Sequence, residues 1–289
     1  MKNNIKHIIY LGILFLFTTG GISPAAGISA DKRFDFLTTR LIADGHGIKR
    51  IKELYGNPKL KFKGKLVAIF LRYSEGSLDY NQFLSASNIA KAKNYMAENA
   101  TIFQTATARY AVPAEFITAI ILIETQLGGN VGRSPVLACL STLASISEPT
   151  VRKGFYDSIK HNSRLHGPEF EAWADRKSAW AYEEVKAFLV YTEKGSQNPL
   201  LIKGSFAGAM GLSQFMPSNI LKYGADGNED GRVDLFIHED AIMSVASYLA
   251  GFGWVPDLSF EAKQKVIWEY NHSTPYVETV FKIAERLIK

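Results

Sequence analysis

The chain has 289 residues, of which 47% are hydrophobic and 21% are charged. These proportions are typical of globular proteins and exclude disordered, collagen-like and coiled-coil chains. The net charge of +5 suits an anionic partner, but no dense run of Lys or Arg indicates nucleic acid, so we predict no nucleic-acid role. The single cysteine, Cys139, excludes an internal disulfide, so the fold depends on its hydrophobic core.

Residues 1–30 have the pattern of a secretory signal peptide. Lys2 and Lys6 precede an apolar run from Ile8 to Phe17, and small residues at 25–30 offer cleavage sites. The run is too short to span a bilayer comfortably, and the alternative is an uncleaved N-terminal anchor. Because no cysteine lies near the cleavage region, we expect no lipid anchor. The pattern predicts an exported, soluble mature protein that comprises residues 31–289.

Helical periodicity dominates the rest of the sequence, which predicts a mainly α fold. Residues 87–110 form one long helical pattern, and Pro113 opens another that reaches Leu127 and stops at Gly128 and Gly129. We expect residues 31–70 to form a helical cap, and residues 71–289 to group helices around a cleft. Residues 146–175 are polar and irregular. Further helical patterns cover 135–146, 177–194, 239–251 and 275–288.

One carboxyl lies on an apolar helix face. Glu124 follows Ile120 by four residues and Ile121 by three, so it continues the face that these residues form. It also lies in the last helical turn, where the helix dipole opposes a negative charge. Apolar surroundings have the same effect, so Glu124 is a candidate general acid. The alternative is a glutamate that reaches solvent or pairs with a buried base.

A hydrolytic glycosidase needs a second carboxylate across the cleaved bond. Glu115 lies nine residues before Glu124, on another face of the same helix. Asp175 and Asp257 are conceivable partners, but nothing in the sequence places them near Glu124. A mechanism that uses one carboxyl would need neither.

Residues 226–234 read Asp-Gly-Asn-Glu-Asp-Gly-Arg-Val-Asp, which resembles an EF-hand calcium loop. Gly231 falls at the turn position, but Ile237 replaces the usual final glutamate, and the later Asp240 is a candidate to close an enlarged loop. The alternative is a solvated turn. A lone loop indicates a structural ion more than a sensor. The predicted ligands, with Arg232 contributing its carbonyl, are Asp226, Asn228, Asp230, Arg232 and Asp240.

Two further segments combine small, polar and aromatic residues. The stretch 204–218 is rich in glycine, alanine and serine, which let a ligand approach the backbone, and Ser205 and Gln214 offer hydrogen bonds to sugar hydroxyls. The stretch 270–276 contains tyrosines and an asparagine suited to a saccharide. The alternative for both is helix packing and capping. His272 is a possible general base, but a capping or structural histidine is the favoured interpretation.

Three blocks together resemble the family of lytic murein transglycosylase B. They are residues 111–128 around Glu124, residues 203–218, and Tyr270-Asn-His-Ser-Thr274, with the calcium-like loop between the last two. The likeness covers roughly residues 70–289. It implies a lysozyme-like α-helical core, with an additional helical lobe, that cleaves the MurNAc-β-1,4-GlcNAc bond of peptidoglycan without consuming water. One glutamate, matched here by Glu124, acts first as acid and then as base to give a 1,6-anhydro end.

The resemblance also implies the rest of the site and the setting of the protein. It predicts a periplasmic monomer that acts on peptidoglycan glycan strands, with cell-wall synthesis or division proteins as candidate partners. Calcium would be structural, and the chemistry would need no cofactor. Pro275 departs from the family pattern, and the second residue of a basic pair is Lys177 where arginine is usual. The implied substrate-binding residues are Ser205, Gln214, Phe215, Tyr248, Tyr270, Asn271, Tyr276, Arg176 and Lys177.

Two other functions remain open on the sequence. The first is a peptidoglycan hydrolase of the lysozyme type, which would activate water with a second carboxylate. The second is a calcium-stabilised wall-binding protein without turnover, in which the catalytic glutamate would be replaced. Glu124 is present, which favours an enzyme.

Overall fold

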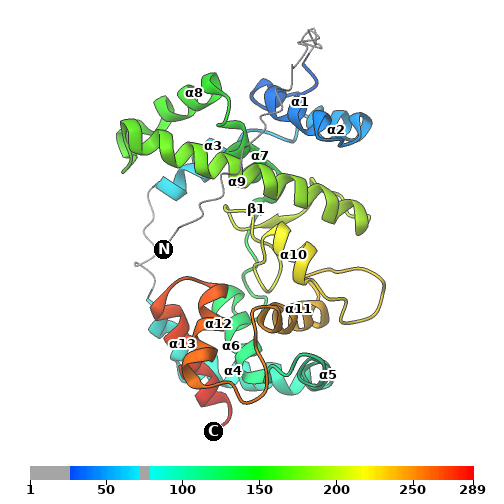
Figure 1. The fold of residues 1–289 in the computed structure, drawn as a ribbon, viewed down its shortest axis with the longest axis vertical. Helices are drawn as coiled ribbons and strands as arrows, with labels where there is room; N and C mark the ends of the chain where they lie inside the picture. Colours follow the sequence, from blue (N-terminus) through cyan, green and yellow to red (C-terminus); the bar gives the residue numbers. More distant parts are fainter. Residues whose placement is uncertain (1–26, 72–78) are drawn as a thin grey trace, which may run out of the picture.

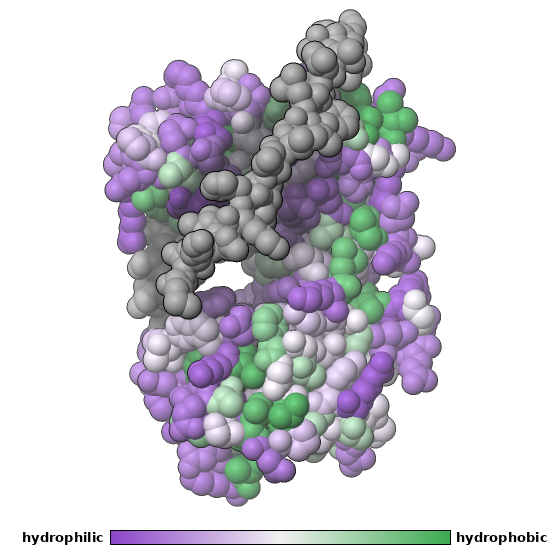
Figure 2. Space-filling view, in the orientation of Figure 1, coloured by the Kyte–Doolittle hydropathy of each residue, from purple (hydrophilic) through white to green (hydrophobic). Residues whose placement is uncertain are grey.

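The computed structural model describes residues 27–71 and 79–289. The predicted signal segment therefore lies almost entirely outside the described residues. The described part of the chain forms two helical lobes, one above the other in Figure 1, joined by a middle layer of loops. Figure 2 shows that the molecular surface is hollowed between these lobes.

The upper lobe is built around a short apolar helix. Every residue of α7 is buried, and α1, α3 and the long helix α9 pack around it. The region predicted as a helical cap, residues 31–70, contains α1, α2 and α3. The elements of this lobe are η1 (Lys32–Phe34), α1 (Asp35–Ala43), α2 (Ile48–Tyr55), α3 (Gly64–Val67), η2 (Ala68–Leu71), α7 (Val136–Ser145), α8 (Pro149–Ile159), η5 (Lys160–Asn162) and α9 (Gly167–Lys194).

The lower lobe has α6 at its centre, with α4, α5, α11 and α13 packed around it. Nine of its twelve residues are buried, as expected of a helix that is apolar on nearly all sides. The elements are η4 (Tyr80–Leu84), α4 (Ala86–Glu98), α5 (Ala100–Tyr110), α6 (Ala114–Thr125), α11 (His238–Gly251), α12 (Phe260–Tyr270) and α13 (Thr274–Leu287).

The middle layer joins the lobes. The short strands β1 (Ser134–Pro135) and β2 (Lys203–Gly204) pair antiparallel, with Ser134 opposite Gly204 and Pro135 opposite Lys203. The glycine-rich segment follows β2 and leads into α10 (Pro217–Tyr223), which packs on α9 and α11. The Thr125 hydroxyl donates to the Leu212 carbonyl at 2.9 Å, which fixes this segment to the end of α6.

Two parts of the predicted helix pattern differ from the structure. The single helix predicted over 87–110 is two helices, because Asn99 ends α4 and begins α5 with non-helical dihedral angles. The irregular stretch 146–175 contains α8 and the start of α9, whose first turn holds Pro168. In the described ranges no single helix is long and apolar enough to cross a membrane; the pair α5–α6, bent by 114°, passes that test only when taken together.

Candidate active site

Glu124 lies in the last turn of α6, the central helix of the lower lobe. The helix ends immediately afterwards, because Gln126, Leu127 and Gly128 all have positive φ angles, of 53°, 62° and 92°. These left-handed residues turn the chain towards the middle layer. Glu124 is therefore held on a buried helix, at the end from which the chain leaves for the middle layer.

The carboxyl of Glu124 has one hydrogen-bond partner among the described residues, the phenol of Tyr276. The Tyr276 hydroxyl donates to Glu124 Oε1 at 2.9 Å. Burial raises the pKa of Glu124 to about 7, and the hydrogen bond from Tyr276 lowers it only in part. Although the residue is partly accessible to solvent, the loss of hydration dominates. Near neutral pH, Glu124 can therefore both give and accept a proton.

A layer of aromatic rings supports this pair. The rings of Tyr270 and Tyr276 stack with centroids 6.4 Å apart and planes 9° apart. The Tyr270 hydroxyl donates to the Ser213 carbonyl at 2.6 Å, which joins α12 to the glycine-rich segment. Burial and the nearby Glu124 raise the pKa of both phenols, so both remain protonated donors at neutral pH. Tyr80, which the sequence reasoning missed, meets the Tyr276 ring edge-on at 6.3 Å.

Phe215 and Tyr248, both predicted to bind substrate, lie beneath this layer. They are 2% and 5% exposed, and each packs against the ring of Tyr270, at 5.9 Å and 4.9 Å. The Tyr248 hydroxyl donates to the Glu269 carbonyl at 2.7 Å. In this structure they offer almost no surface to a ligand and support the ring of Tyr270, and their direct contact with substrate stays a prediction.

The other predicted contacts of the lower lobe and middle layer lie near the surface. Ser205 Oγ accepts hydrogen bonds from the backbone N–H groups of Ala207 and Ala209, so it shapes its own loop. The Gln214 side-chain amide donates to the carbonyl oxygens of Gly211 and Val131. Asn271 is half-buried directly after α12, next to Tyr270. Pro275 occupies the first turn of α13, where a proline is tolerated, and Tyr276 reaches Glu124.

The predicted basic pair lies on α9, in the upper lobe. Arg176 is exposed, and the Lys177 ammonium lies 5.4 Å from the ring centre of Phe70 and 5.0 Å from that of Trp180. Phe70 also meets Phe206 of the glycine-rich segment edge-on at 5.2 Å. The sequence reasoning missed these three aromatic residues. They come from segments far apart in the chain, so the sequence does not show that they meet. The sequence shows only that Lys177 and Trp180 are three residues apart on one helix.

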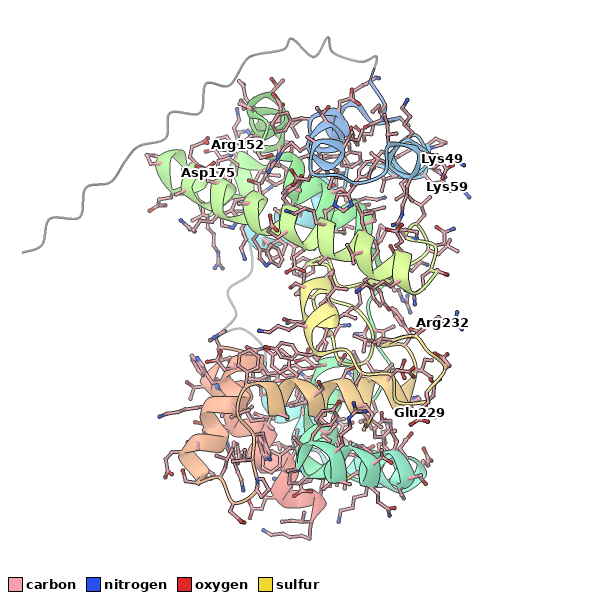
Figure 3. The ribbon with its side chains drawn as sticks, turned by 45° about the vertical axis from the view of Figure 1, so that its right-hand side comes forward. Lys49, Lys59, Arg152, Asp175, Glu229 and Arg232 are labelled. Carbon is pink, nitrogen blue, oxygen red and sulfur yellow. The ribbon has the colours of Figure 1, made fainter. Side chains whose placement is uncertain are left out.

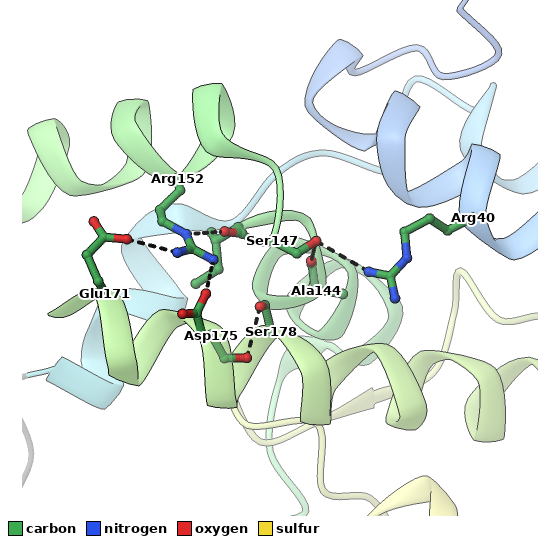
Figure 4. Close-up of polar contacts among 8 residues, drawn as sticks. Arg40, Ala144, Ser147, Arg152, Glu171, Asp175 and Ser178 are labelled. Atoms are coloured by element: carbon green, nitrogen blue, oxygen red, sulfur yellow. Dashed lines mark hydrogen bonds and ion pairs between the residues drawn. The ribbon is translucent and has the colours of Figure 1, made fainter. Parts of the chain in front are cut away.

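The two conceivable partner carboxylates lie elsewhere. Asp175 is on α9 and accepts a hydrogen bond from Arg152 at 2.6 Å (Figure 4). Asp257 is exposed in the loop before α12. Within the described residues, no carboxylate contributes to the pKa shift of Glu124. The buried Glu184, which the sequence reasoning missed, accepts two hydrogen bonds from Ser218 and so anchors α10 to α9. His272 is exposed at the end of α12.

The predicted calcium loop is closed by its own hydrogen bonds. Asp226 accepts the N–H groups of Asp230 and Gly231, and Asp230 accepts that of Arg232. Both oxygens of the fully buried Asp240 accept backbone N–H groups, from residues 227, 228 and 234. The loop lies at the edge of the molecule, where Figure 3 labels Glu229 and Arg232.

The donor atoms of this loop are of the type that calcium prefers and follow the order of a calcium loop, but they are not arranged around a common point. Oxygen-bearing side chains alternate along it, as a hard cation prefers. However, no group of three or more His, Cys, Asp or Glu side chains in the described residues converges to hold a metal ion. The role predicted for Asp240 is not shown, because its carboxylate oxygens bind the loop backbone.

Comparisons with known proteins agree with this architecture. Residues 35–264 match the sequence model of the Transglycosylase SLT domain, so the chain belongs to this family. The membrane-bound lytic murein transglycosylase B of Escherichia coli (strain K12) is 32% identical over 174 residues. The match covers 60% of this chain and 41% of that protein, so the chain matches less than half of this relative.

Solved structures share the fold. The Escherichia coli lytic transglycosylase Slt35 in complex with calcium superposes with a TM-score of 0.70 at 21% identity, over 89% of this chain and 92% of that chain. SltB3 from Pseudomonas aeruginosa, in complex with NAG-NAM-pentapeptide, gives a TM-score of 0.70 at 19% identity, over 88% and 78%. At these identities the structures define the fold: the chain has the helical fold of solved lytic transglycosylases.

Proposed function

We propose that this protein is an exported lytic transglycosylase that cleaves the glycan strands of peptidoglycan. The observation that carries the proposal is the half-buried carboxyl of Glu124, with a pKa of about 7 and the Tyr276 phenol as its hydrogen-bond partner. Membership of the Transglycosylase SLT domain family supports the reaction class. The NAG-NAM-pentapeptide bound by the related SltB3 supports the substrate class.

The proposed reaction uses Glu124 twice. Because Oε1 accepts the Tyr276 hydroxyl, Oε2 carries the proton that passes to the glycosidic oxygen between MurNAc and GlcNAc. As the bond from that oxygen to C1 breaks, the 6-hydroxyl of the muramoyl residue attacks C1. The Glu124 carboxylate then takes the hydroxyl proton and regains its starting state. The products are a 1,6-anhydromuramoyl end and a free GlcNAc 4-hydroxyl, and no water is consumed.

The proposal is tested by comparing Glu124→Gln with the wild type on purified peptidoglycan. An amide cannot supply or accept the proton, so we expect cleavage to fall by at least about 10³-fold, since each of its two proton transfers contributes on the order of 10²- to 10⁴-fold. Binding to sedimented peptidoglycan should persist, because the amide keeps the shape of the side chain. Cleavage at the wild-type rate by the variant would overturn the proposal.

We also propose that the loop at residues 226–232 binds a structural calcium ion. Its alternating oxygen donors and the calcium complex of Slt35 support this. The ion would draw the carboxylates of Asp226 and Asp230 together, and Asp240 would hold the loop backbone from below. No step of the proposed reaction uses the ion.

A further inference from the structure

Positive charge is concentrated at one end of the molecule. Residues 31–65 contain ten Lys and Arg against four Asp and Glu, a net charge of +6, whereas the whole chain has +5. Lysines alternate at positions 59, 61, 63 and 65, in the segment that leads into α3. Figure 3 shows Lys49 and Lys59 at the outer edge of the upper lobe. Such a surface attracts anions before any specific contact forms.

A cavity lies at this end, in the upper lobe, whereas Glu124 is on α6 of the lower lobe. It has a volume of about 570 Å³ and opens between residues 62–66 and α8. Phe62, Val151 and Phe155 give it apolar walls, and Lys63 and Lys65 lie at its edge. No carboxylate is among the described residues that line it. A cavity of this size, apolar with a few charged groups, is typical of a small-ligand site.

The two lysines are available to a ligand. Neither Lys63 nor Lys65 forms an ion pair with any described residue. Arg33 also lines the cavity, but it is held by Asp31 at 2.7 Å and lies 4.5 Å from the centre of the Phe62 ring. Two ammonium groups with no ion-pair partner among the described residues therefore border an apolar hollow, which suits an anion that carries a small apolar group.

The walls of the cavity are fixed by contacts on the far side of α8. Arg152 donates to the Ile146 carbonyl at 2.8 Å, to Glu171 at 2.8 Å and to Asp175 at 2.6 Å (Figure 4). These bonds tie α8 to α9 and to the end of α7. A preformed site loses little entropy when a ligand binds, which favours measurable affinity for a small ligand.

We propose that this cavity binds the carboxylate end of a peptidoglycan peptide stem, outside the catalytic cleft. The inference rests on the proposed function, which supplies the substrate class. The carboxylate would lie between Lys63 and Lys65, and the small apolar side chain next to it would pack on the partly exposed Phe62 and Val151. A free phosphate would leave the apolar walls unused, so a carboxylate beside a small apolar group fits this lining better. The site would hold the enzyme on the wall while Glu124 acts on a strand.

The test is calorimetric titration of the full protein with a synthetic stem pentapeptide, alongside the same peptide amidated at its C-terminus. Lys65→Ala removes one ammonium group, and we expect roughly tenfold weaker binding, as for loss of one charge-assisted hydrogen bond. Gly154→Leu fills the hollow, because Gly154 lines it and a Cβ there meets no atom within 4 Å. Lys61→Ala is the matched control, because it removes the same charge from the same segment outside the cavity.

The proposal predicts that the free peptide binds to the wild type and to Lys61→Ala, and more weakly to the other two variants. Equal binding of the amidated peptide, or no effect of Gly154→Leu, would overturn it. Tighter binding of inorganic phosphate or of anionic vesicles than of the peptide would overturn it as well. The titration is read without cleavage, so its result is independent of whether the protein cleaves peptidoglycan. Cleavage of strands stripped of peptides should be unchanged in Lys65→Ala.

Discussion

At the scale of single residues, the chemistry depends on an acid whose ionised form is poorly stabilised. Among the residues that the structure describes, Tyr276 gives Glu124 its one hydrogen bond, and no cation lowers the pKa of Glu124. Its apolar face and its place at the helix end were visible in the sequence. Its partner was not, because Tyr276 lies 152 residues away in the chain and only the packing of α13 on α6 brings the two together.

The raised pKa predicts that Glu124 destabilises the folded protein at alkaline pH. The folded carboxyl has a pKa of about 7 against 4.5 as its ordinary value, so the free energy of unfolding falls as pH rises through this window. By pH 8 the loss approaches about 3 kcal/mol. Glu124→Gln should therefore raise the melting temperature by several degrees at pH 8 and much less at pH 5. A shift of the same size at both pH values would contradict the assigned pKa.

Tyr276→Phe removes the hydrogen bond that favours the Glu124 carboxylate. The pKa of Glu124 should rise further, so the alkaline limb of the pH–rate profile should move to higher pH while the maximal rate falls. The measurement is kcat/KM on peptidoglycan fragments between pH 5 and 9. Tyr270→Phe is the matched control, because its hydroxyl binds the Ser213 carbonyl instead. An unmoved limb in Tyr276→Phe, or an equal movement in both variants, would count against this role.

At the scale of elements, the glycine-rich segment is a packed turn that leaves no room for a side chain at its glycine positions. Gly211 has a φ of +71°, and a Cβ there would overlap Leu235. Gly211→Ala should lower the free energy of unfolding by roughly 3 kcal/mol or more, from overpacking and left-handed strain. Gly253 has a φ of +97° but open space around it, so Gly253→Ala should cost only about 1–2 kcal/mol. Denaturant titration compares the two, and equal losses would refute the packing argument.

The loop at 226–232 gives a prediction for metal removal that is independent of the proposed reaction. An ion that binds only the folded state adds stability that grows with its concentration, about 2.7 kcal/mol at one hundred times its Kd. We expect EDTA to lower the melting temperature of a calcium-loaded sample by several degrees and Asp226→Ala to abolish that difference. Activity at 25 °C should change little. An identical melting temperature with calcium and with EDTA would reject the site.

The helices themselves were predictable where apolar periodicity and end signals agreed. Pro113 and the glycines after Leu127 bounded α6 within a few residues, and α11 and α13 followed their patterns closely. The sequence failed at α8 and the start of α9, because these helices are amphipathic with many charges and their ends depend on Glu148 and Pro168. It also merged α4 and α5, since the bend at Asn99 leaves the apolar pattern unbroken.

At the scale of the whole molecule, the candidate site is assembled from segments far apart in the chain. Glu124 comes from α6, Ser213 from the middle layer, and Tyr270 and Tyr276 from α12 and α13. The sequence motifs contain these residues, but they do not show which side chains are exposed and which are buried. Phe215 and Tyr248 are buried, and both rings pack against that of Tyr270. The basic pair comes from α9 of the upper lobe, so we expect both lobes to meet one glycan strand.

The central claim is that a single carboxyl cleaves the glycan without water. Mass spectrometry of the products from purified peptidoglycan tests it most directly, with Glu124→Gln as the control. We expect fragments one water molecule lighter than hydrolysis products, without reducing ends, and none of them from the variant. Fragments with reducing ends would contradict it and identify a hydrolase. No fragments at all, with binding to the wall intact, would contradict it in favour of a wall-binding protein.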